Sequence, residues 1–226
     1  EADLSRAPTT ISAGMPAGVE AFERWGRDGG PENGTTHLVV VDAWGDAVAL
    51  TATIEGAFGS QRMASGFLLN NQLTDFSFTP TLNGRPVANA VGPGKRPRSS
   101  MAPTIVTDRN GELVLAIGSP GGSAIIGYVS RATIATLDWN MPVQDAINLS
   151  NATARTAMAN VEVQRMPAGV ADALRARGWQ FRDTSGLEES GLHAIRVTPR
   201  GLEGGADPRR EGIVGRIPAP SAGVQR

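Results

Sequence analysis

A strand that begins at Thr35 constrains the fold of this chain more than any other feature. The run HLVVVD at 37–42 is typical of a buried strand, and the segment 47–54, rich in small and β-branched residues, is typical of a returning one. The four residues between them suit a turn, so the sequence predicts a β-hairpin. With the turn at its centre, Thr53 or Ile54 lies across from Thr35. Two threonine hydroxyls are therefore expected to meet at one end of the hairpin.

A second hairpin is predicted further along, from segments Thr104–Thr107 and Leu113–Ile117 around an Asp-Arg-Asn-Gly turn. Its return strand runs into the glycine-rich segment 118–123, which reads GSPGGS. Residues 123–137 are then apolar around most of the circumference, as expected of a helix that covers a sheet. The sequence therefore predicts a strand, a tight glycine turn and a buried helix in succession.

The other predicted elements are short. Helices are expected at Val19–Trp25, Pro142–Ala152 and Ala168–Arg177, late strands at Gln180–Asp183 and Leu192–Val197, and an irregular tail from Gly212.

Composition excludes several classes of function. Lys and Arg number 21 against 22 Asp and Glu, without a long basic run, which argues against nucleic-acid binding. No apolar stretch approaches the roughly 18 residues that span a bilayer. The chain has no Cys, and its two His, His37 and His193, stand in no triad or metal motif, so we interpret them as ordinary strand residues. No metal or other cofactor is expected, and the chemistry must use hydroxyls, carboxylates, amides or the backbone.

Four motifs occur in the same order as in a known family. They are Thr35-Thr36-His37 opening a strand, GFLLNNQLTDF at 66–76, KRPRSSM at 95–101 and GSPGG at 118–122. Together they resemble the γ-glutamyltransferase (γ-glutamyl transpeptidase) family, over a region from Thr35 to about Arg209. Four ordered motifs are far more specific than any one of them.

The resemblance implies an α+β fold, the αββα sandwich of N-terminal-nucleophile hydrolases, in which a large and a small subunit share the sheets. It also implies a precursor that cuts itself before Thr35. Residues 1–34 would end the large subunit, and 35–226 would form the small catalytic subunit. The start at Glu1, which is neither an initiator Met nor a leader, fits a fragment. Relatives are often periplasmic or secreted, so the same location is expected here, with a cytoplasmic one left open.

An N-terminal threonine joins a nucleophile and a base in one residue, because its α-amine can take the hydroxyl proton near neutral pH. The resemblance makes Thr35 this nucleophile and the Gly34–Thr35 bond the cleavage site, where a residue without Cβ leaves the attack unobstructed. Thr53 is expected to orient the Thr35 hydroxyl. Backbone N–H groups of Gly121 and Gly122, near the start of a helix, suit an oxyanion hole.

The resemblance also assigns the substrate contacts. Gln72 and Asp75 match the positions that bind a free α-amine, and Ser99 and Ser100 match those that bind an α-carboxylate. The asparagine pair before Gln72 is expected to hold the loop.

Two departures from the family pattern bear on specificity. Glu55 stands where typical members have Asn, which is expected to bring an extra negative charge near the substrate. The segment between Phe78 and Lys95 is short and has no Tyr, so no aromatic gate is expected over the site. Both departures resemble the branch of cephalosporin acylases.

The sequence thus predicts a self-cleaving enzyme, a zymogen in its uncut form, that acts on γ-glutamyl amides such as glutathione, by hydrolysis more than by transfer. Its partners would be the large subunit of the same precursor and a small-molecule substrate. One alternative is a glutaryl or cephalosporin-type acylase of the same superfamily, and another is a non-catalytic homologue. Expressed alone, the fragment is expected to be inactive and prone to aggregation.

Overall fold

The computed structural model describes residues 34–154, 158–186 and 190–217, and two packed β-sheets form the body of the molecule. In the first sheet, β1 (Thr35–Val41) pairs antiparallel with β2 (Ala47–Thr53). The second sheet has the strand order β13-β12-β8-β7. Its members are β7 (Thr104–Thr107), β8 (Leu113–Gly118), β12 (His193–Thr198) and β13 (Gly201–Ala206).

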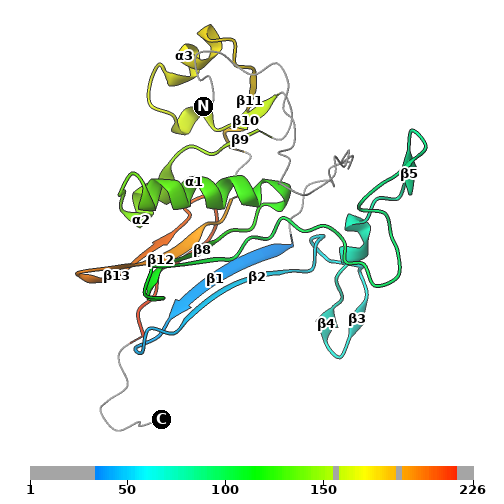
Figure 1. The fold of residues 1–226 in the computed structure, drawn as a ribbon, viewed down its shortest axis with the longest axis horizontal. Coiled ribbons are helices and arrows are strands. Elements are labelled where there is room, and N and C mark those ends of the chain that lie inside the picture. Colours follow the sequence, from blue (N-terminus) through cyan, green and yellow to red (C-terminus); the bar gives the residue numbers. More distant parts are fainter. Residues whose placement is uncertain (1–33, 155–157, 187–189, 218–226) are drawn as a thin grey trace.

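Helices cover one face of the larger sheet, and the β1–β2 hairpin packs on the other (Figure 1). The helices are α1 (Ile125–Leu137), preceded by the 3-10 turn η2 (Gly122–Ala124), and α2 (Val143–Asn148). Between helices and sheet lies the main hydrophobic core, whose fully buried members include Leu115, Ile117, Ile125, Ile147 and Leu192. Each such side chain contributes about 1.5–3 kcal/mol through its removal from water. The described residues therefore form a helix layer and two sheet layers.

Two smaller units are attached to this body. One contains β9 (Ala152–Ala154), β10 (Ala159–Val161) and β11 (Phe181–Asp183), with the 3-10 turn η3 (Val163–Arg165) and helix α3 (Val170–Ala176). The other joins β2 to β7 and projects to the right in Figure 1. It contains β3 (Met63–Ala64), β4 (Phe67–Leu68), the 3-10 helix η1 (Gln72–Asp75), β5 (Thr81–Leu82) and β6 (Arg85–Pro86).

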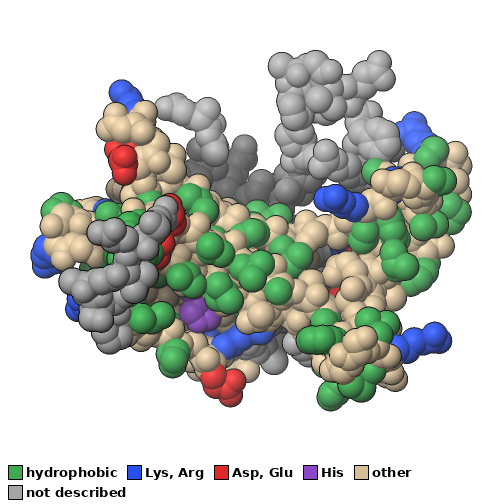
Figure 2. Space-filling view, turned by 90° about the horizontal axis from the view of Figure 1, so that it is seen from below, with side chains coloured by type: hydrophobic (Ala, Val, Ile, Leu, Met, Phe, Trp, Pro, Cys, Tyr) green, Lys and Arg blue, Asp and Glu red, His purple; other side chains and the backbone are tan. Residues whose placement is uncertain are grey.

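The outer face of the β1–β2 hairpin is apolar and exposed. Cross-strand pairs Leu38–Leu50 and Val40–Val48 lie on this face, with exposed fractions between 43% and 53%. Seen from below, the same side of the body carries many hydrophobic side chains (Figure 2). Exposed apolar side chains gathered on one face in this way are typical of an interaction surface.

Most predicted elements are confirmed, and the differences have local causes. Both hairpins form as predicted, and the buried helix begins at Ile125 after a 3-10 turn. The prediction of a helix at Pro142–Ala152 was wrong at its end. The backbone becomes extended at Leu149, and the chain pairs as β9 from Ala152. The predicted helix at Val19–Trp25 lies outside the described residues.

Strand β13 was not predicted. Its sequence, GLEGGA, has no apolar alternation and is rich in glycine. It nevertheless pairs with β12 along its whole length, from Thr198–Gly201 to His193–Ala206. The tight turn at Gly201, where φ is +109°, brings the two strands together. Among the described helices, none has both the length and the apolar character needed to cross a membrane.

Candidate active site

The two threonines predicted to meet do so at the end of the first hairpin. Thr35 lies directly opposite Thr53 in the antiparallel register. The Thr35 hydroxyl donates a hydrogen bond of 2.9 Å to the Thr53 hydroxyl oxygen. Thr35 is only 7% exposed, on the face of the hairpin that meets the larger sheet. The geometry therefore holds the Thr35 hydroxyl in one orientation.

Gly34 continues the hairpin by one residue beyond Thr35. Its N–H donates to the Glu55 carbonyl at 3.1 Å, and its own carbonyl accepts from the Ile54 N–H at 3.2 Å. A Cβ at this position would lie 2.6 Å from the carbonyl oxygen of Gly56, which is closer than real Cβ contacts. Only glycine therefore fits at the residue before the predicted cleavage point.

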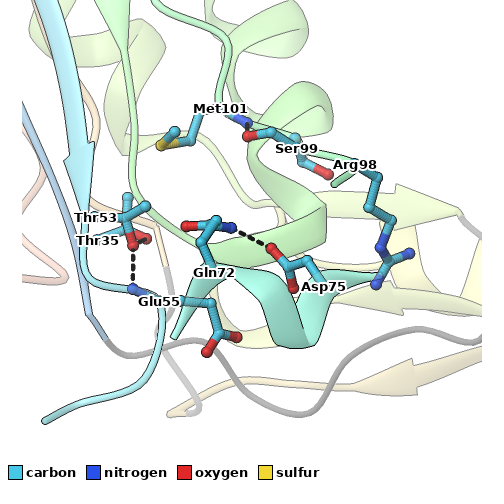
Figure 3. Close-up of a pocket in the computed structure, with 9 residues that line it drawn as sticks. Thr35, Thr53, Glu55, Gln72, Asp75, Arg98, Ser99 and Met101 are labelled. Atoms are coloured by element: carbon cyan, nitrogen blue, oxygen red, sulfur yellow. Dashed lines mark hydrogen bonds between the residues drawn. The ribbon is translucent and has the colours of Figure 1, made fainter. Parts of the chain in front are cut away.

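Most of the predicted site residues line one open pocket (Figure 3). Its wall consists of Thr35, Thr53, Glu55, Gln72, Asp75, Arg98, Ser99, Ser100 and Met101. These residues come from β1, the end of β2, η1 and the segment before β7. Arg98 and Met101 received no role in the sequence analysis, although both lie in the 95–101 motif, and that position was the signal that could have revealed them.

The residues predicted to bind an amine lie together on η1. The Gln72 side-chain amide donates to the Asp75 carboxylate (Figure 3), and the Gln72 backbone N–H donates to Asn70 Oδ1 at 3.0 Å. A carboxylate and an amide oxygen at the same wall are acceptors that suit an ammonium group.

The two sides of the pocket are joined by Asn89, which sequence reasoning missed. Its Nδ2 donates to the Asp75 carbonyl at 2.6 Å, and its Oδ1 accepts from the Arg98 N–H at 3.0 Å. Next to Arg98, the Ser99 hydroxyl oxygen accepts from the Met101 N–H at 3.2 Å. A single amide thus sets the distance between the acidic side and the hydroxyl side of the pocket. No local sequence pattern signals such a bridge.

Among the described residues, the wall of this pocket does not include Gly121 or Gly122. Both are buried and have positive φ, +127° and +55°, in the turn that leads from β8 into η2. The same turn begins at Gly118, against which the imidazole of His37 rests. The oxyanion role of Gly121 and Gly122 therefore remains a prediction. His37 links this turn to the strand that begins at Thr35.

His37 is a buried neutral histidine near neutral pH. It is 4% exposed, and its Nδ1 shares a hydrogen bond of 2.8 Å with the Thr51 hydroxyl. Burial, and secondarily the nearby His193, lower the pKa of His37 from 6.5 to about 4. Both histidines lie in strands, as predicted, and within the described part of the chain no cluster of three His, Cys, Asp or Glu could hold a metal ion.

Comparison with known proteins identifies the family of the chain. The family model described as Gamma-glutamyltranspeptidase matches residues 8–217. The glutathione hydrolase proenzyme of Pseudomonas aeruginosa is 37% identical over 199 residues, covering 79% of this chain and 34% of the relative. The Escherichia coli glutathione hydrolase proenzyme is 39% identical over 190 residues, covering 78% of this chain and 32% of the relative. An acylase ACY 1 proenzyme of a Pseudomonas strain is 34% identical over 192 residues, covering 83% of this chain and 33% of the relative.

The chain thus spans about a third of the length of these curated relatives. Among solved structures, a gamma-glutamyltranspeptidase from Pseudomonas nitroreducens complexed with L-DON is 33% identical with a TM-score of 0.70, covering 80% of this chain and 99% of that one. A Helicobacter pylori gamma-glutamyltranspeptidase T380A mutant is 36% identical with a TM-score of 0.66, covering 77% of this chain and 100% of that one. The match of the family model to most of the sequence, together with these relatives, shows that the chain belongs to the gamma-glutamyltranspeptidase family.

Proposed function

We propose that the protein containing this chain is an N-terminal-threonine amidohydrolase and acyltransferase that acts on γ-glutamyl amides such as glutathione. The observation that carries the proposal is the Thr35–Thr53 hydroxyl pair in the wall of a pocket that also contains Gln72 and Asp75. Relatives that are glutathione hydrolase proenzymes support it. Hydrolysis is proposed to exceed transfer, since the short segment between Phe78 and Lys95 contains no aromatic residue that could form a gate over the site.

The reaction follows from the chemistry of the pocket. The Thr35 oxygen attacks the γ-carbonyl carbon, while the free α-amine of Thr35, with a pKa of about 7.7–8.0 in model compounds, takes the hydroxyl proton. The Gly121 and Gly122 N–H groups are proposed to stabilise the oxyanion. The C–N bond then breaks, the leaving amine receives the proton, and an ester on Thr35 remains. Water or an acceptor amine attacks this ester and restores the Thr35 hydroxyl.

Two sides of the pocket suit the two ends of a glutamyl group. We propose that Gln72 and Asp75 receive the α-ammonium, while the Ser99 and Ser100 hydroxyls donate to the α-carboxylate. Arg98 lies next to Ser99 in the same wall of the pocket.

We further propose that the amine of Thr35 becomes free by self-cleavage. The Thr35 hydroxyl attacks the Gly34 carbonyl, the peptide bond becomes an ester, and water hydrolyses that ester. Residues 1–34 would then end the large subunit, and 35–226 would be the small subunit. The exposed outer face of the β1–β2 hairpin is where we place the large subunit, whose helices would complete the αββα sandwich. A periplasmic or secreted location remains a prediction.

The acylase proenzyme among the relatives favours a second candidate, an acylase that removes a glutaryl-type group. The two candidates differ in one group of the substrate, the α-amine. A glutaryl group would leave the Asp75 carboxylate without a cationic partner, and an unpaired charge in a binding pocket is unfavourable.

The test uses the full-length precursor and the mature enzyme purified from it. Mass analysis should show a new chain that starts at Thr35, and Thr35→Ala should abolish it. The mature enzyme should hydrolyse γ-glutamyl-p-nitroanilide. Turnover of glutaryl-p-nitroanilide alone would refute the γ-glutamyl assignment in favour of the acylase, and an uncut precursor over days would favour a non-catalytic homologue.

A further inference from the structure

The segment that leads from β8 into η2 contains a fully buried serine, Ser119. Its hydroxyl donates a hydrogen bond of 2.6 Å to the carbonyl of the next residue, Pro120. The same oxygen accepts from the Gly191 N–H at 3.1 Å. A serine hydroxyl can donate once and accept, and both functions are used here inside the protein. Removal of this hydroxyl would therefore leave buried backbone groups without their partner.

The Ser119 hydroxyl lies where the backbone pairing of the larger sheet stops. Strands β12 and β8 pair as far as His193 opposite Gly118. The same register would place Gly191 opposite Pro120, which has no N–H to donate, so the backbone ladder cannot continue. The Gly191 N–H instead donates to the Ser119 oxygen. A side chain thus extends the pairing beyond the ends of the two strands.

The segment Ser190–Leu192 is a buried support for this turn. A Cβ on Gly191 would lie 2.7 Å from Cγ of Pro120, so the backbone of Gly191 lies directly against the proline ring. On either side of Gly191, the Asp207 carboxylate accepts from the Ser190 hydroxyl at 2.7 Å and from the Leu192 N–H at 3.2 Å. The side chains of Ser190, Leu192 and Asp207 are fully buried. The support is therefore held in place from inside the protein.

The Pro120 carbonyl and the Gly121 N–H belong to one peptide unit. The described part of the chain has no cis peptide bond, so this unit is trans and planar, and its C=O and N–H point in opposite directions. The hydrogen bond from Ser119 to the Pro120 carbonyl therefore also sets the direction of the Gly121 N–H. Gly121 adds little restraint of its own, because its φ of +127° lies in a region where only a glycine backbone moves freely.

The Gly121 N–H has no partner within the protein. Gly121 is buried, and in the part of the chain that the structure describes its N–H donates to no protein acceptor. Buried backbone N–H groups of this kind are rare, and a catalytic role is one of the few explanations for them. The direction of this N–H is therefore important for the oxyanion role that we propose for Gly121.

We propose that Ser119 is a positioning residue of the oxyanion turn, because its hydroxyl fixes the Pro120 carbonyl and thereby directs the Gly121 N–H. Gly191 keeps that hydroxyl in place. This role rests on the proposed function, in which the Gly121 N–H stabilises the developing negative charge. Ser119 is buried and, among the described residues, is not part of the pocket wall. It therefore acts on the rate of the chemical steps and leaves substrate binding to the residues of that wall.

The first test is Ser119→Ala in the mature full-length enzyme. Loss of one oxyanion donor lowers kcat by about 10²–10³-fold, so a donor that is misdirected and not lost should lower it by about 10-fold. For γ-glutamyl-p-nitroanilide, kcat and kcat/KM should fall by the same factor, as expected when an interaction made only in the transition state is weakened. L-Glutamate should inhibit the variant and the wild type alike, because its two charged groups meet the pocket wall.

Ser150→Ala is the matched control. The Ser150 hydroxyl also donates to a backbone carbonyl, that of Glu162 at 2.8 Å, but it lies next to β9 and not in the turn. Both serine variants should unfold at a lower temperature than the wild type, and both are assayed well below that temperature. Only Ser119→Ala should lose kcat. Gly191→Ala, whose Cβ would press on the Pro120 ring, should lower kcat in the same way as Ser119→Ala.

Three results would overturn the role. One is wild-type kcat in Ser119→Ala. Another is an equal loss of kcat in Ser150→Ala, which would assign the effect to stability alone. The third is inhibition by L-glutamate that weakens as much as kcat falls, which would mean that the whole pocket has moved.

Failure of the proposed function is distinguishable from failure of this role. A wild-type enzyme without activity on any γ-glutamyl amide would refute the function. The positioning role is then decided by crystal structures of the wild type and of Ser119→Ala. The Pro120–Gly121 peptide unit should rotate in the variant while the Thr35–Thr53 pairing stays; an unmoved peptide unit would overturn the role.

Discussion

The imidazole of His37 rests directly on the backbone of Gly118. A Cβ added to Gly118 would lie 2.2 Å from His37 Cε1, well inside any normal contact. His37 is two residues beyond Thr35 on the same face of β1, and Gly118 ends β8 three residues before Gly121. The missing side chain at Gly118 therefore lets the strand of the proposed nucleophile approach the strand that leads to the proposed oxyanion turn.

Gly118→Ala is expected to push these strands apart. Because the added methyl meets a buried ring in a packed interface, we expect a loss of about 1–3 kcal/mol in the free energy of unfolding. The rate constant kcat should fall as well, since the turn shifts relative to Thr35. Thermal or denaturant unfolding and steady-state kinetics check this. Gly215→Ala is the control, because a Cβ there meets open space; equal effects of both substitutions would contradict the steric explanation.

Stability should fall as the pH drops through the range set by His37. Burial lowers the pKa of His37 to about 4 in the folded protein, against 6.5 in the unfolded chain. The unfolded state therefore binds the proton first, and the stabilisation is complete above about pH 6.5 and lost progressively down to about pH 4. The total is about 3 kcal/mol for this shift.

Unfolding midpoints of the wild type and of His37→Gln, measured between pH 7 and about pH 4, test the role of His37. The glutamine variant should lack this component of the pH dependence. His193 in β12 also lowers the pKa of His37, although less than burial does. The same measurement on His193→Gln shows how much of the pH dependence His193 contributes. An unchanged slope in His37→Gln would assign the pH dependence to other groups.

Thr53→Val should slow both self-cleavage and turnover. Valine keeps the shape and removes the hydroxyl that accepts the 2.9 Å hydrogen bond from Thr35. We expect kcat to fall about 100-fold, the lower end of the usual range for losing a group that assists proton transfer. Thr51→Val is the matched control, since the Thr51 hydroxyl binds His37 instead. Wild-type rates of cleavage and turnover in Thr53→Val would exclude a role for this hydroxyl.

A buried ionic cluster fastens the end of the described chain to the body. Arg209 donates to the Glu162 carboxylate at 2.5 Å and to Asp207 Oδ1 at 3.1 Å, with all three side chains almost fully buried. Asp207 also accepts from the Ser190 hydroxyl at 2.7 Å. Arg209→Met would leave two buried carboxylates without their cation, so we expect a loss of about 3–5 kcal/mol.

The matched control is Arg175→Gln, which breaks the exposed ion pair with Asp172. Such pairs contribute about 0–1 kcal/mol, so this variant should unfold close to the wild type. Denaturant unfolding of both variants decides the matter. A small effect of Arg209→Met would show that the two carboxylates find other partners or become protonated.

Local sequence determined much of this protein. The β1–β2 hairpin, the meeting of Thr35 with Thr53, and the strand, glycine turn and helix from Leu113 to Leu137 all arise within short stretches, where turn residues and the alternation of side chains set the register. Most of the predicted pocket residues are likewise found in one wall.

Tertiary structure decided the rest. Strand β13 forms because β12 offers it hydrogen bonds, and Asn89 and Ser119 take their roles from partners brought near by the fold. The contact of Ser119 with Gly191 depends on the pairing of β8 with β12, because a long-range contact is chosen by the geometry of two segments and neither encodes it alone.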